Sequence, residues 1–157
     1  MIEDTVRQQL HDRLDVARAG LLAALKGVTE RDFATDLGGE TVVQLLARVA
    51  AEERTAAAHA LGETYAARTV EKPMPPQVVH ALAGARHRTR RYLDAPDATE
   101  ATARTLVEAA EGREREAAAR IAARPPLPPL PEAPALPEIP MIPPDQARRA
   151  NLQPPTS

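Results

Sequence analysis

The sequence predicts an all-α protein, an antiparallel four-helix bundle over residues 1–124 with a polyproline II-like tail over residues 125–157. Apolar side chains recur every three or four residues in four segments, as on the buried face of a helix. No segment shows a convincing strand-like alternation, and prolines crowd the C-terminal segment. A chain of 157 residues therefore forms one core and leaves a tail beyond it.

The first predicted helix covers residues 2–26. Its apolar stripe consists of Val6, Leu10, Leu14, Ala17, Leu21 and Leu25. Gly27 provides a C-terminal stop, and residues 28–39 form a linker. Thr41 and Gln44 then have the spacing of a capping box, which predicts that a second helix begins directly after Thr41.

Two further helices follow prolines. Pro76 suits the first turn of a third helix, which we expect to run to Leu93. Its predicted stripe is Val79, Leu82, Ala83, Arg86, Arg90 and Leu93, and its two arginines predict that this helix is the most exposed of the four. Thr99 or Asp97 can cap a fourth helix that reaches Arg124. The stripe of the fourth helix is Leu106, Ala110, Ala117 and Ile121.

Composition excludes several kinds of chemistry. The chain has no cysteine, which rules out disulfides, thiolate metal sites and a cysteine nucleophile. Its only serine is Ser157, and it has no glycine-rich phosphate loop. A net charge of -2 provides no field that would attract nucleic acid or an anionic membrane. The charged N-terminal segment is unlike a signal peptide, so we expect a cytoplasmic protein.

The histidines and a basic run could still form a site. His80 and His87 share one face of the third helix, and His59 or Glu53 could complete a set of metal ligands. We favour the alternative, in which the histidines are solvated or cap helix ends, because the sequence contains no Glu-x-x-His motif. Residues 86–91 contain four arginines. They spread around the helix without aromatic stacking partners, so we favour a solvated surface over nucleic-acid binding.

Two segments resemble the DinB/YfiT-like bundles, a bacterial family that includes the mycothiol-dependent maleylpyruvate isomerases. Residues 39–54 are similar to the family's capped second helix, in which a metal-binding histidine follows a Leu-Ala pair. Residues 106–121 are similar to its last helix, which carries two more histidines one turn apart. The resemblance spans Leu10 to Arg124 and implies a four-helix bundle with a divalent metal that activates a thiol or water.

The three positions that match the family's metal ligands are Arg48, Gly112 and Glu116. None is a histidine, and arginine has no free lone pair for a metal. The resemblance thus implies a bundle that has lost its metal site and needs no cofactor. We hypothesise that Arg48 and Glu116 face each other as an ion pair in its place, the alternative being that both reach solvent.

Prolines recur at every third position from Pro125 to Pro143, which matches the three residues per turn of polyproline II. A second edge of such a helix is apolar: Leu127, Leu130, Ala133, Leu136, Ile139 and Ile142. An apolar edge in water favours docking, either on its own bundle or on a partner. The alternative is a stiff linker whose leucines are incidental.

These observations predict a non-catalytic, metal-free interaction domain with the tail as its contact element. A homodimer is a further option, because such bundles often pair through an exposed helical face. The alternative is a metal-dependent thiol transferase or isomerase whose ligands are His59, His80 and His87.

Overall fold

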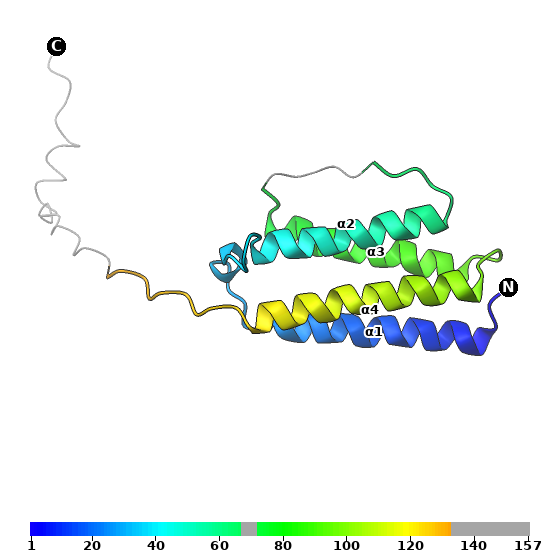
Figure 1. The fold of residues 1–157 in the computed structure, drawn as a ribbon, viewed down its shortest axis with the longest axis horizontal. Coiled ribbons are helices and arrows are strands. Elements are labelled where there is room, and N and C mark those ends of the chain that lie inside the picture. The colour runs from blue at the N-terminus through cyan, green and yellow to red at the C-terminus, as the bar shows by residue number, and fades with distance from the viewer. Residues whose placement is uncertain (67–71, 133–157) are drawn as a thin grey trace, which may run out of the picture. The chain divides into compact units, whose positions relative to one another are not determined.

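The computed structural model describes residues 1–66 and 72–132. Within these ranges the chain forms α1 (Asp4–Leu25), a short 3₁₀ helix η1 (Asp32–Ala34), α2 (Val42–Ala60), α3 (Pro75–Asp94) and α4 (Glu100–Ala122). One compact unit spans Met1–Leu127 and contains all of these helices. The all-α four-helix bundle is therefore confirmed (Figure 1).

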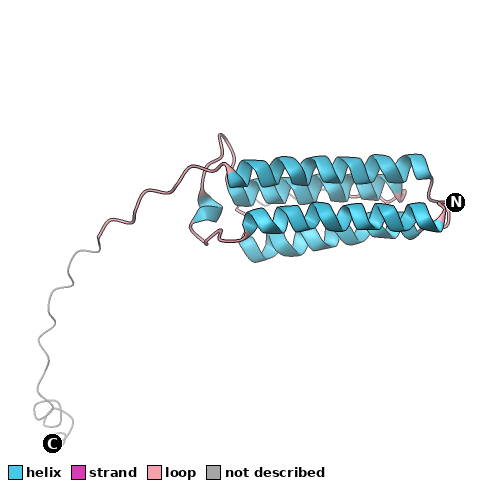
Figure 2. Cartoon of the chain, turned by 90° about the horizontal axis from the view of Figure 1, so that it is seen from below, coloured by secondary structure: helices cyan, strands magenta, loops and turns pink. Residues whose placement is uncertain are grey.

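The helices form two parallel pairs that run antiparallel to each other (Figures 1 and 2). α1 packs mainly on α4, and α2 packs mainly on α3. One core cluster unites Leu21 near the end of α1 and Ile121 near the end of α4 with Val42 and Val78 at the starts of α2 and α3. Because α2 and α3 run in the same direction, α2 ends and α3 begins at opposite ends of the bundle.

The helix ends follow the chemistry of the sequence. Thr41 Oγ1 accepts the Gln44 N–H at 3.2 Å, and the Gln44 side chain accepts the Thr41 N–H at 2.9 Å, which confirms the capping box. Thr99 caps α4 by accepting the Thr102 N–H at 3.3 Å. Gly39, just before α2, has a φ of 112°, a conformation that side-chain-bearing residues rarely adopt.

The core consists mainly of Leu, Val and Ala, and it includes Tyr92. The stripes predicted for the first and fourth helices are buried or half-buried throughout. The prediction that the third helix is the most exposed is wrong, because seven residues of α3 are buried and only three of α1. Its stripe was also misplaced: Val79 is 58% exposed, whereas Val78 beside it is buried.

Candidate functional site

The middle of the core contains four charged side chains, one from each helix. They are Arg18 of α1, Glu53 of α2, Arg86 of α3 and Glu114 of α4. Each lies on the buried stripe of its helix, three or four residues from a buried apolar neighbour such as Leu14 or Ala117. Because residues three or four positions apart lie on the same face of a helix, all four charged side chains point into the interior.

Arg86 is the centre of this cluster and is only 5% exposed. Its Nε donates to Glu53 Oε1 at 2.8 Å, and its Nη2 donates to Glu114 Oε1 at 2.5 Å. Its Nη1 donates to the Leu14 carbonyl at 2.8 Å. One guanidinium thus joins three other helices through charge-assisted hydrogen bonds, an arrangement suited to its planar set of donors.

Arg18 and Thr89 complete the cluster. Arg18 Nε donates to Glu114 Oε1 at 3.0 Å, and Arg18 Nη2 lies 3.9 Å from Glu53 Oε2. The Thr89 hydroxyl donates to Glu53 Oε1 at 2.9 Å. The two carboxylates balance the two guanidiniums, so the cluster has no net charge. Both carboxylates lie within 4 Å of a guanidinium, so the cluster joins the four helices through paired buried charges.

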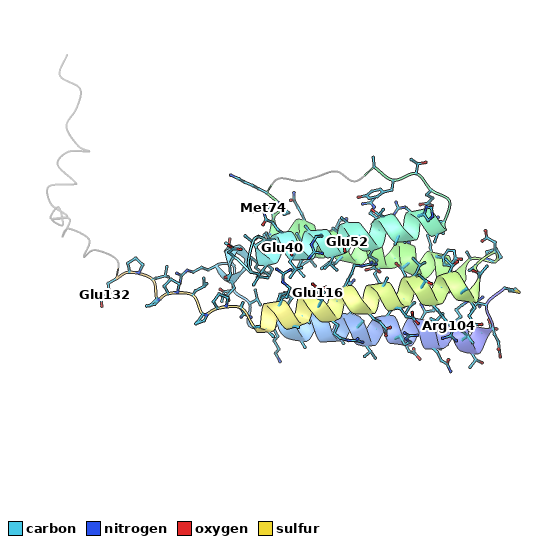
Figure 3. All side chains as sticks on the ribbon, in the orientation of Figure 1. Glu40, Glu52, Met74, Arg104, Glu116 and Glu132 are labelled. Carbon is cyan, nitrogen blue, oxygen red and sulfur yellow. The ribbon has the colours of Figure 1, made fainter. Side chains whose placement is uncertain are left out.

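The three positions that match the family's metal ligands do not meet in the core. Arg48, Gly112 and Glu116 are all exposed, and Figure 3 marks Glu116 on α4. Arg48 bonds Glu40 at 2.8 Å and Glu52 at 3.3 Å, so the hypothesised Arg48–Glu116 ion pair is wrong. The physical reason is helical phase, because α2 and α4 point Glu53 and Glu114 inward and leave the predicted positions outside.

The histidines do not form a metal site either. His59, His80 and His87 are exposed, the first on α2 and the others on α3. Across residues 1–66 and 72–132, no three His, Asp or Glu side chains are grouped so as to hold a metal ion. The buried carboxylates already bind guanidiniums, so the side chains present do not fit the divalent metal that the resemblance implies.

The four arginines within residues 86–91 of α3 bind partners in three different places. Arg86 enters the core, which the prediction of a solvated surface missed. Arg88 and Arg91 bond Glu63 at 2.5 Å and 2.7 Å, whereas Arg90 pairs with Asp15 of α1. The run therefore presents no single basic face.

The apolar edge predicted for the tail lies only partly in the described ranges. Leu127 is half-buried and Leu130 is 72% exposed. Leu136, Ile139 and Ile142 lie outside the described residues.

Sequence reasoning missed the interior cluster, although a signal for it was present. On the faces that the structure buries, one charged residue lies among the apolar side chains midway along each helix, and the four charges sum to zero. Arg86 was placed on its stripe but interpreted as a mark of exposure. Four such charged residues at one level of a bundle predict mutual pairing, since a single buried charge is too costly.

Comparison with protein-family models, with curated proteins and with solved structures found no match for the chain. No helix in the part of the chain that the structure describes is long and apolar enough to cross a membrane.

Proposed function

We propose that this chain is a non-catalytic interaction domain, a DinB-like bundle that works without a metal and makes contacts through its C-terminal tail. The observation that carries the proposal is the Arg–Glu cluster in the core. Bundle enzymes build their cofactor and metal sites from side chains on facing helices at this place. In this chain the same place holds the Arg–Glu cluster, in which Arg86 forms ion pairs with Glu53 and Glu114. Contacts with other molecules are therefore made at the surface.

The tail supplies the contact element in this proposal. Leu130 is 72% exposed and belongs to the apolar edge that continues, by sequence, through Leu136, Ile139 and Ile142. A run of exposed apolar side chains is stabilised when it is covered. The cover is either the chain's own bundle or a second copy of the chain.

The isoleucines make this testable in the full-length protein. The chain has four, Ile2 and Ile121 in the bundle and Ile139 and Ile142 in the tail. Selective ¹³C labelling of the isoleucine δ1 methyls therefore gives two bundle signals and two tail signals. We expect the tail signals to depart from random-coil positions and to return to them in a Leu130→Ser/Leu136→Ser variant. Sedimentation over a range of concentrations separates docking on the same chain from a homodimer.

Random-coil positions for both tail signals at every concentration would overturn the tail's role. Metal analysis of protein purified without a His-tag tests the other part of the proposal. A stoichiometric metal that raises the melting temperature, with a chelator reversing the effect, would favour the thiol transferase or isomerase instead.

A further inference from the structure

Two adjoining hollows lie between α2 and α3, away from the buried Arg–Glu cluster. The first has a volume of about 320 Å³. Its walls are mainly apolar: Ala47, Ala50, Ala51, Val78 and Ala81, with Tyr65, Pro73, Gln77 and Arg54 around them. This hollow is at the lower end of the range of about 300–1,000 Å³ that small-molecule pockets occupy, so it suits a short apolar chain.

The second hollow is cationic and has a volume of about 280 Å³. It is lined by Arg54, His80, Ala81, Gly84, His87, Arg88 and Arg91. Arg54 and Ala81 line both hollows, so the two hollows adjoin at these residues and together form the groove discussed below. Arg88 and Arg91 share the single carboxylate of Glu63, so positive charge remains in excess.

Arg54 stands at the junction with its hydrogen-bonding capacity unused. Its guanidinium lies 4.3 Å from the centre of the Tyr65 ring, which covers one face and leaves the N–H groups at the edge free to donate. Its Nε is buried and has no hydrogen-bond partner. No carboxylate among the described residues pairs with it, and a buried donor without an acceptor is destabilising.

We propose that this groove binds a short aliphatic monocarboxylate, a ligand class that goes beyond the tail-mediated contacts proposed above. The carboxylate accepts hydrogen bonds from Arg54, and the aliphatic chain covers Ala50 and Val78 in the apolar hollow. Charge complementarity selects an anion over a cation, and the adjoining apolar walls select a chain-bearing anion over a small one.

Octanoate is the probe. Octylamine has the same aliphatic chain with the opposite charge, and acetate has the same carboxylate without the long chain. Titration of the full-length protein is followed by calorimetry and by amide chemical shifts. We expect saturable binding of octanoate, no binding of octylamine and much weaker binding of acetate. Arg54→Met should weaken octanoate binding about tenfold or more, because it removes a charge-assisted hydrogen bond.

Gly84→Leu provides a second variant that does not depend on charge. Gly84 lines the cationic hollow, and a Cβ added there meets no atom within 4 Å, so the position has open space for a side chain. Gly20→Leu on α1 is the matched control, since a Cβ there also meets nothing within 4 Å and Gly20 lies outside this groove. Gly84→Leu should block octanoate, and Gly20→Leu should leave its affinity unchanged.

Three results would overturn the proposal: no saturation by octanoate, equal binding of octylamine, or binding unaffected by both Arg54→Met and Gly84→Leu. Circular dichroism melting of each variant verifies that a loss of binding is not a loss of folding. The isoleucine signals of the tail report separately on the interaction domain, so failure of one proposal does not imply failure of the other.

Discussion

Replacing Arg86 with methionine tests whether the interior cluster holds the four helices together. Methionine keeps much of the side chain's volume but removes the charge and the bonds to Glu53, Glu114 and the Leu14 carbonyl. Glu114 keeps Arg18 at 2.9 Å. Glu53 keeps only the Thr89 hydroxyl at 2.9 Å and Arg18 at 3.9 Å. The variant therefore leaves one buried carboxylate without a close cation.

Removing one partner of a buried ion pair costs about 3–5 kcal/mol. For a bundle of this size that corresponds to a fall in melting temperature of about 10–20 °C. Arg104→Met is the matched control. Arg104 pairs with Glu100 at 2.7 Å on the surface of α4, with both side chains more than 40% exposed (Figure 3). An exposed pair of this kind contributes about 0.3–0.5 kcal/mol.

Urea unfolding followed by circular dichroism measures both costs. A loss below about 1 kcal/mol for Arg86→Met, or one no larger than that of Arg104→Met, would refute the conclusion that the cluster holds the four helices together. The triple variant Glu53→Leu/Arg86→Met/Glu114→Leu separates charge from packing. Since it leaves no carboxylate buried in the cluster, it should regain most of the stability that Arg86→Met loses.

Three further outcomes are expected. The hydrogen bonds from Arg48 lower the pKa of Glu40 from 4.5 to about 2, so this carboxylate stabilises the fold above pH 4.5 and loses its contribution as the pH falls through 2. Glu40→Gln should therefore cost about 1–2 kcal/mol at pH 7 and almost nothing near pH 2, measured by urea unfolding at both pH values; equal costs at both would contradict the argument. Thr41→Ala removes the cap of α2 and should cost about 1 kcal/mol, whereas no change would mean that the cap is not formed in solution. Glycine-to-alanine changes should have opposite signs at two sites: Gly39→Ala, at a φ of 112°, should destabilise by about 1 kcal/mol, and Gly84→Ala in α3 should stabilise by about 0.5–1 kcal/mol, so equal signs in thermal melts would refute the backbone argument.

The candidate site was harder to predict than the helices. Periodicity identified the faces of α1 and α4 because their apolar residues leave little choice of phase. On α3 an error of one residue exchanged buried Val78 for exposed Val79. On α2 and α4 the family resemblance, and not periodicity, placed Arg48 and Glu116 inside, whereas the structure points Glu53 and Glu114 inward. A resemblance carried by short, alanine-rich segments could not correct the phase.

The sequence by itself determined the local structure: four helices and the Thr41 capping box. These features depend on interactions within a few residues, which a linear pattern records. Only the tertiary structure decided that α2 and α3 run parallel and that Arg18, Glu53, Arg86 and Glu114 meet in the core. The sequence around a charged residue on one helix does not identify its partner on another helix. Its burial is favourable only when a residue of opposite charge pairs with it across the bundle.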